Sequence, residues 1–251
     1  MENHSNGQFP SRGLAAWGLF PAAVLGALVC TAKADEAGES NVEELFLSDM
    51  AYTQERGEIQ LTLELGRLDE ADGRRADAAV ELEYGLSDAV QLSIGAPYTV
   101  YDDALGPTRR FGDLEAGLAV RLLQTGRHTL TAGLEVGYPA WDNGPDTDDS
   151  LEWEPSLHYG VLLDGVQLHA GLGAEIESGE TEFSYHMAVV LPGDAVSAVV
   201  ESSIADDAVF VVPGLVIHAF GDGQYNIGVP LGLGTSSGDR GLLMKAVWEF
   251  R

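Results

Sequence analysis

The chain is 251 residues long, with 31 glycines, only 10 prolines and a hydrophobic fraction of 45%. These proportions are typical of a folded domain and exclude an intrinsically disordered chain. Acidic residues outnumber basic residues 40 to 13, and the net charge of −27 argues against nucleic acid or another polyanion as a partner. Beyond the N-terminus no apolar run reaches 18 residues, which excludes a membrane protein built from helices.

Residues 1–34 are predicted to be an export signal. Arg12 precedes an apolar run at 13–30, and the Ala32-Lys33-Ala34 stretch has the small-x-small pattern of a cleavage site. An uncleaved anchor is the alternative. Cleavage would remove Cys30, the only cysteine, and leave 11 basic and 39 acidic residues, a net charge of −28. Such a surface repels the lipopolysaccharide of an outer membrane unless divalent cations bridge the two, and it is equally the mark of a solubilising or high-salt composition.

Residues 35–56 are polar and acidic apart from one apolar knot, Leu45-Phe46-Leu47. Three interpretations stay open for this segment: a periplasmic lead-in, a short helix, or a plug inside the lumen of a barrel.

From residue 57 onward, twelve segments are predicted to be β-strands. Most of them alternate apolar and polar residues, the period-two pattern of a strand with one apolar face, and those near 195–203 and 208–220 are less regular. In the hairpin at 114–138, for example, Leu118 and Leu134 alternate with Glu115 and Glu135. Each segment is close to the roughly 9–11 residues that a tilted strand needs to cross a bilayer, whereas soluble strands average about five or six. The predicted strands lie near 57–67, 77–85, 89–99, 114–122, 129–138, 151–163, 166–177, 182–191, 195–203, 208–220, 224–233 and 241–251.

The connections between these segments alternate in length, as periplasmic turns and external loops do in a bacterial barrel. The tight ones lie near 85–88, 124–127, 164–165, 192–194 and 221–223, and the others, which are mostly longer, near 68–76, 100–111, 139–150, 178–181, 204–207 and 234–240. An even strand count then places both ends of the barrel on the periplasmic side. Pro213 predicts a bulge or break in its strand.

The predicted fold is therefore all-β, an antiparallel transmembrane β-barrel of about twelve strands at 57–251. Aromatic residues near the predicted strand ends fit the girdles of such a barrel, namely Tyr84, Tyr138, Trp141, Trp153, Phe220, Trp248 and Phe250. The rival interpretation is a soluble secreted β-barrel or sandwich.

Charged and imidazole side chains fall on the predicted lumen faces. The candidate lumen-lining residues are Glu64, Glu83, Glu115, Arg121, Glu135, Glu154, His158, His169, Glu175, His186 and His218. Carboxylates dominate this set, so an open pore would favour cations over anions. The histidines lack tight metal-ligand spacing, so we predict neither a metal nor a cofactor. Ser156 and His158 share a face that points inward, so we predict no catalytic site; an integral lipid hydrolase is the less favoured alternative.

Four stretches carry a resemblance to a known family: YTQERGEIQLTLELG, ELEYGLSDAVQLSIGAPY, FGDLEAGLAVRLL and GLEVGYPAWD. Over about residues 52–142 the chain resembles the phenol-degradation meta-pathway outer-membrane proteins, a group of transporter-like β-barrels. It departs from them at 138–141, which reads Tyr-Pro-Ala-Trp where that family often has a Pro-Thr-Gly loop.

The resemblance implies a protein of the bacterial outer membrane that passes small solutes, hydrophobic or aromatic ones among them. The expected partners are outer-membrane lipid, the solute, and the barrel assembly machinery, which reads an aromatic-ended last strand; here Arg251 follows Phe250. A closed barrel with a structural or adhesive role is the other alternative.

Overall fold

A computed structural model describes residues 42, 44–70, 73–103, 106–140, 150–205, 208–219 and 223–251. The predicted export signal, Trp141 and Phe220 lie outside these residues. Within them every regular element is a β-strand, and no helix there has the length and apolarity to cross a membrane.

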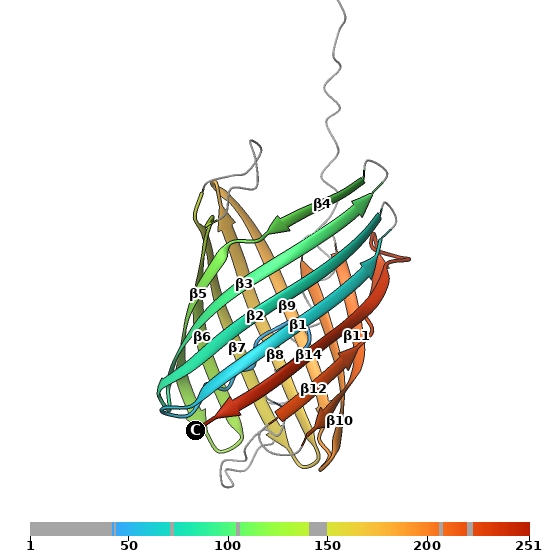
Figure 1. The fold of residues 1–251 in the computed structure, drawn as a ribbon. Helices are drawn as coiled ribbons and strands as arrows, with labels where there is room; N and C mark the ends of the chain where they lie inside the picture. Colours follow the sequence, from blue (N-terminus) through green and yellow to red (C-terminus); the bar gives the residue numbers. More distant parts are fainter. Residues whose placement is uncertain are drawn as a thin grey trace, which may run out of the picture. The chain divides into compact units, whose positions relative to one another are not determined.

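Fourteen strands form one antiparallel sheet that closes on itself (Figure 1). Closure comes from the pairing of the first strand with the last, from Ile59 opposite Phe250 to Asp69 opposite Arg240. The strands are β1 (Ile59–Asp69), β2 (Gly73–Ser87), β3 (Val90–Asp103), β4 (Gly106–Phe111), β5 (Leu114–Thr125), β6 (His128–Tyr138), β7 (Glu152–Leu163), β8 (Val166–Glu177), β9 (Glu180–Leu191), β10 (Val196–Ala205), β11 (Ala208–His218), β12 (Gly223–Gly228), β13 (Leu231–Gly234) and β14 (Arg240–Phe250).

These fourteen elements occupy twelve positions around the barrel. β4 and β5 both pair with β3, one after the other, and β12 and β13 both pair with β11 and β14. The prediction of an antiparallel barrel of about twelve strands is confirmed.

The predicted break at Pro213 is wrong for its own strand, and the neighbouring strand is the one that is interrupted beside it. β11 runs through Pro213 without a register shift against β10, and the Val229 N–H donates to the Pro213 carbonyl at 3.0 Å. The carbonyl and nitrogen of one residue point to the same side of a strand, so the missing N–H of Pro213 also faces this neighbour. The neighbour is interrupted there, between β12 and β13, where the chain reads Val229-Pro230.

Two of the predicted long loops are strands instead. In the predicted loop at 68–76, β1 continues to Asp69 and β2 already begins at Gly73. In the predicted loop at 100–111, β3 and β4 occupy most of the stretch. Charged residues interrupt the alternation in these stretches, so the sequence pattern does not show the strands. Opposite charges face each other between β1 and β2, where Arg74 Nε lies 3.4 Å from Asp69 Oδ1.

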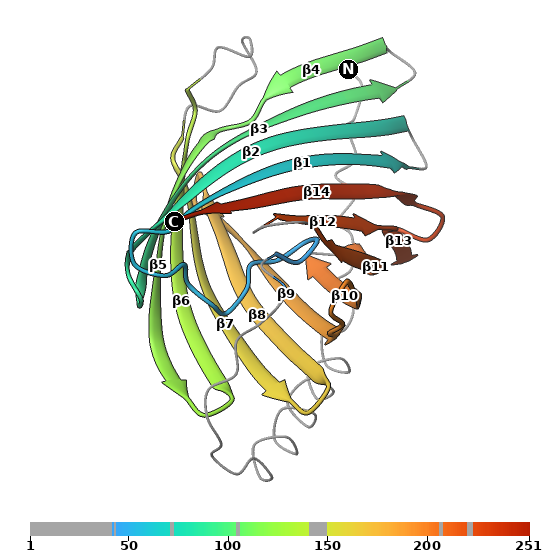
Figure 2. The same cartoon turned by 60° about the horizontal axis from the view of Figure 1, so that its bottom comes forward.

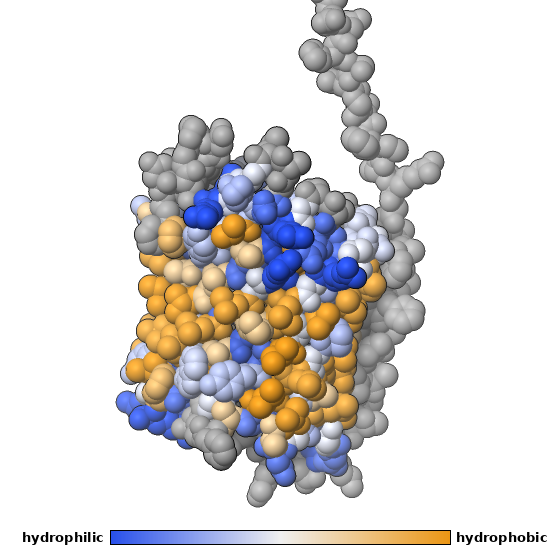
Figure 3. All heavy atoms as spheres, turned by 45° about the vertical axis from the view of Figure 1, so that its right-hand side comes forward, coloured by the Kyte–Doolittle hydropathy of each residue, from blue (hydrophilic) through white to orange (hydrophobic). Residues whose placement is uncertain are grey.

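The apolar faces of the strands form the outer surface. Leu63, Leu118 and Leu172 are 41%, 41% and 44% exposed, and comparable exposed side chains on the other strands form a belt around the barrel. Figure 3 shows this belt on one face. A continuous apolar surface of this kind is unfavourable in water and favourable in the hydrocarbon core of a membrane. The aromatic residues Tyr84, Tyr138, Trp153 and Phe250 are also exposed. The rival sandwich is wrong, because these aliphatic residues face outward instead of meeting between two sheets.

The strand alternation predicts a polar interior, but part of the interior is apolar. Val190, Val199, Val212 and Val216 point inward from β9, β10 and β11 and are fully buried. They pack against Val42, Leu45, Phe46 and Met50 of the segment that precedes β1. Strands with apolar residues on both faces lose the period-two signal, which is why the sequence pattern of β10 and β11 is irregular.

Candidate functional site

The segment at 44–58, which we call the inner segment, runs inside the ring of strands (Figure 2). Its best-defined contact is with Glu201 of β10, a carboxylate with no exposed surface. Glu201 accepts hydrogen bonds from the backbone N–H of Phe46 at 2.7 Å, the N–H of Leu47 at 3.0 Å and the hydroxyl of Ser48 at 2.7 Å. Hydrogen bonds to an ionised acceptor are roughly twice as strong as neutral ones, so Glu201 fixes this turn of the inner segment.

The ring of Phe46 sits in a socket lined by two glycines. Gly214 of β11 and Gly228 of β12 stand opposite each other in the sheet, and a Cβ added to either one would overlap the ring. The missing side chains therefore make the space into which Phe46 packs, beside Val212.

Further hydrogen bonds hold the inner segment along its length. They run from the Thr131 hydroxyl to the Ala51 carbonyl at 2.5 Å, from the Gln54 N–H to Gln91 Oε1 at 2.8 Å, from Asn226 Nδ2 to the Glu44 carbonyl at 2.9 Å, and from Gln60 Nε2 to Glu44 Oε1 at 3.0 Å. The partners come from β1, β3, β6 and β12, so the inner segment is tied to several sides of the wall.

A buried cation balances part of the interior charge. Lys245 Nζ of β14 lies 3.2 Å from Glu64 Oε2 and 3.7 Å from Glu44 Oε2. Burial raises the pKa of the Glu44 carboxyl to about 7, and the nearby Lys245 ammonium works in the opposite direction.

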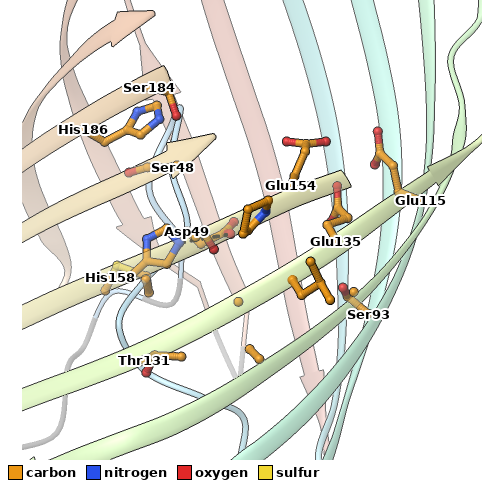
Figure 4. A pocket seen from close by; sticks show the side chains of 18 of the residues that line it. Ser48, Asp49, Ser93, Glu115, Thr131, Glu135, Glu154, His158, Ser184 and His186 are labelled. Carbon is orange, nitrogen blue, oxygen red and sulfur yellow. Dashed lines mark ion pairs between the residues drawn. The ribbon is translucent and has the colours of Figure 1, made fainter. Parts of the chain in front are cut away.

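Between the inner segment and the wall lies a cavity of about 440 Å³. Side chains from β5, β6, β7 and β9 point into it, together with Ser48 and Asp49 of the inner segment (Figure 4). Nine carboxylates line the cavity, and no lysine or arginine is among the described residues that do: Glu44, Asp49, Glu81, Glu83, Glu115, Glu135, Glu154, Glu175 and Glu182.

Two pairs of these carboxylates face each other directly across neighbouring strands. Glu135 stands opposite Glu154, and Glu175 stands opposite Glu182. Like charges in such positions destabilise a sheet. A cation in the cavity would relieve that repulsion, and an anion would add to it.

The histidines are divided between the cavity and its surroundings. His158 and His186 line the cavity. His158 is buried, and its Nε2 makes no hydrogen bond and lies 3.8 Å from Asp49 Oδ2. His169 is buried edge-on to the ring of Tyr52, at 5.9 Å between centroids, and His218 lies 2.9 Å from the Ser197 hydroxyl. Within the described residues no three side chains form a group that could hold a metal ion.

The structure thus brings seven of the eleven candidate residues to one cavity: Glu83, Glu115, Glu135, Glu154, His158, Glu175 and His186. Glu64 pairs with Lys245, and Arg121 lies near the turn end of β5, opposite the buried Thr131. Sequence reasoning missed Glu201. Its signal was present, because Glu201 is the only charged residue in the stretch 195–205.

No protein-family model matches the chain. No curated protein matches it by sequence. Among solved structures, the chain is similar to the COG4313 outer membrane channel from Pseudomonas putida F1, with 12% identity, a TM-score of 0.63, and coverage of 80% of this chain and 98% of that one. It is also similar to the KdgM porin, with 7% identity, a TM-score of 0.56, and coverage of 76% and 99%. At these identities the likeness concerns the fold, and the chain has the fold of outer-membrane β-barrel proteins.

Proposed function

We propose that this chain is a bacterial outer-membrane channel that lets small solutes pass passively and favours cations over anions. The observation that carries the proposal is the cavity lined by nine carboxylates inside a barrel with an apolar outer belt. Both structural relatives named above are called a channel or a porin. The negative electrostatic potential in such a lumen attracts cations and repels anions before any specific contact is made.

The inner segment acts, in this proposal, as a plug that narrows the path to the cavity. Support comes from its anchors on opposite sides of the wall, at Glu201, Thr131 and Gln91. The solute would pass between the plug and the acidic wall of β5, β6 and β7, where the lining carboxylates lie.

The solute class is narrowed by two observations that point in different directions. The resemblance to the phenol-degradation meta-pathway outer-membrane proteins favours aromatic or hydrophobic solutes. The carboxylate lining disfavours any solute that carries a negative charge. We therefore propose neutral or cationic small molecules, aromatic ones included, as the solutes.

Catalysis is not part of the proposal. Ser156 and His158 both line the cavity, but no hydrogen bond joins them among the described residues. The charged group beside His158 Nε2 is the Asp49 carboxylate, at 3.8 Å. A serine hydrolase needs its nucleophile and base within hydrogen-bond reach.

Ion selectivity in planar bilayers tests the channel proposal. Under a KCl gradient the reversal potential of the full chain is expected to have the sign that shows K⁺ to be more permeant than Cl⁻. The double variant Glu135→Gln/Glu154→Gln should lower the cation-to-anion permeability ratio by about thirtyfold at low salt. Each unit charge at 8 Å in water is worth about 0.5 kcal/mol on each ion, so two charges change the difference between a cation and an anion by about 2 kcal/mol.

The matched control for that experiment is Asp194→Asn, which removes one charge from the exposed turn between β9 and β10, away from the cavity. It should leave the ratio unchanged. Anion selectivity of the unaltered chain would contradict the proposal, and so would an equal effect of the control.

A further inference from the structure

Four arginines stand in a row on the outer face of the barrel, at the end away from the short turns. They are Arg240 of β14, Arg67 of β1, Arg74 of β2 and Arg109 of β4. We propose that this row, the arginine row, is a binding site for the phosphate groups of a phosphorylated lipid in the outer leaflet, with lipopolysaccharide as the source.

The strand register places the four side chains on one face. Asp69 stands opposite Arg240 on one side and Arg74 on the other, and Arg67 lies two residues before Asp69, so it points the same way. Arg109 stands opposite Val100 of β3, which stands opposite Ala76, two residues after Arg74. Neighbouring strands are about 4.8 Å apart, so the four spacings from β14 to β4 make the row about 19 Å long.

The row has positive charge in excess. Arg67 and Arg74 share one carboxylate, Asp69, at 3.1 and 3.4 Å. The described acidic residues on this face are Asp69 and Asp102, against four arginines. The side chains of Arg67 and Arg74 are 58% and 66% exposed, so their guanidinium groups remain accessible to a ligand.

The charge is confined to one side of the barrel. Six of the 13 basic residues of the chain lie at this end, on β1, β2, β4 and β14: Arg67, Arg74, Arg75, Arg109, Arg110 and Arg240. From β5 to β13 the only basic residues are Arg121 and Arg127, near the turns at the other end. In a chain with a net charge of −27, this local concentration is a specific feature and not a general property of the surface.

The apolar belt begins directly beside the row. Leu65 and Leu242 lie two residues from Arg67 and Arg240 on the same face, and Phe111 lies two residues from Arg109; all three are exposed, at 54%, 43% and 48%. Two residues along a strand span about 6.6 Å. Figure 3 shows hydrophilic side chains at the loop end above the apolar belt. A lipid seated here would place its chains on the belt and its phosphate at the row.

Arginine suits this role, because its planar guanidinium can bind phosphate through two parallel hydrogen bonds. The arginine row also lies at the end of the barrel where an outer-leaflet lipid can reach it. Long connections lie on the external side in bacterial barrels, and the arginine row lies opposite the end where Ile59 pairs with Phe250. The outer-leaflet lipid can therefore meet the row despite the acidic charge of the chain as a whole.

Binding of purified, folded full-length protein to lipid A tests the inference. The quadruple variant Arg67→Gln/Arg74→Gln/Arg109→Gln/Arg240→Gln is expected to bind diphosphorylated lipid A about tenfold more weakly than the unaltered chain, as measured by native mass spectrometry in detergent. The matched control is Arg75→Gln/Arg110→Gln, on the same strands but on the inner face, and it should bind as the unaltered chain does. Heat-modifiable gel mobility shows that each variant is folded.

Four outcomes would overturn the inference. The first is equal loss of binding in the control variant, and the second is undiminished binding in the quadruple variant. The third is equal binding of lipid A from which both phosphates have been removed, which would assign the affinity to the acyl chains. Displacement of lipid A by millimolar inorganic phosphate would show a site for free phosphate and would also overturn the lipid assignment.

Discussion

Leu118→Arg should prevent the barrel from folding stably in a bilayer. Leu118 lies near the middle of β5, is 41% exposed, and has Leu92 and Leu134 beside it at the same level of the belt. An arginine on the lipid face near the midplane of a membrane barrel costs about 2–4 kcal/mol. Guanidinium unfolding of the protein in liposomes, followed by tryptophan fluorescence, would measure the loss.

The matched control is the next residue. Ala119 faces inward and lines the acidic cavity, so Ala119→Arg introduces the same side chain beside several carboxylates. We expect this variant to fold with little loss of stability and to lower the preference for cations. Equal destabilisation by the two substitutions would show that β5 does not separate lipid from lumen.

Glu201→Ala should open the lumen. The substitution removes the acceptor of three hydrogen bonds from the inner segment, at Phe46, Leu47 and Ser48. Each bond to a charged group contributes about 1.5–3 kcal/mol, and about 1.4 kcal/mol corresponds to a factor of ten in an equilibrium. The occupancy of an open, high-conductance state in single-channel recordings should therefore rise by about tenfold or more.

A double-mutant cycle identifies the socket of Phe46 as the second anchor. Gly214→Ala alone should open the channel because its Cβ overlaps the Phe46 ring. Phe46→Ala alone should open it because the ring is lost. In the double variant the two effects should add only in part, since the methyl group introduced at Gly214 no longer meets the ring but still lies close to the Ile227 carbonyl oxygen, at 2.8 Å.

Glu115→Ala is the control for loss of a lumen charge, because Glu115 lines the cavity from β5. It should alter selectivity and leave the open-state occupancy unchanged. If Glu201→Ala and Glu115→Ala behaved alike, the inner segment would not be the plug that we propose.

The sequence alone predicts most of the barrel, because a long strand with lipid on one face must alternate at every second residue. Leu63, Leu82 and Ile94 could be assigned to the outer face from this rule and are exposed on it. The tight turns were equally clear, since Asp164-Gly165 has the composition of a two-residue hairpin and Gly165 has a φ of 75°.

The missed elements depend on contacts between distant parts of the chain. β4, which reads Gly-Pro-Thr-Arg-Arg-Phe, has no alternation and is a strand only because β3 extends beside it. The break between β12 and β13 lies at Val229-Pro230, beside Pro213 of β11. Periodicity describes one strand at a time, so it reveals neither partner.

The same limit applies to the site. The carboxylates could be assigned to the inner face one strand at a time, but the direct opposition of Glu135 and Glu154 follows from register. The inner segment carries no periodic pattern, and the socket for Phe46 is made by the absence of side chains at two glycines. The arginine row likewise combines residues from four strands.

Spin labels along β5 test the central claim, that alternate residues face lipid and lumen. Labels are placed singly at 115–120 in a chain whose Cys30 is replaced by serine, and the protein is reconstituted in liposomes. We expect apolar O₂ to relax labels at 116, 118 and 120 most strongly, and a water-soluble nickel chelate to relax those at 115, 117 and 119. Equal accessibility of the two sets to both reagents would contradict the account.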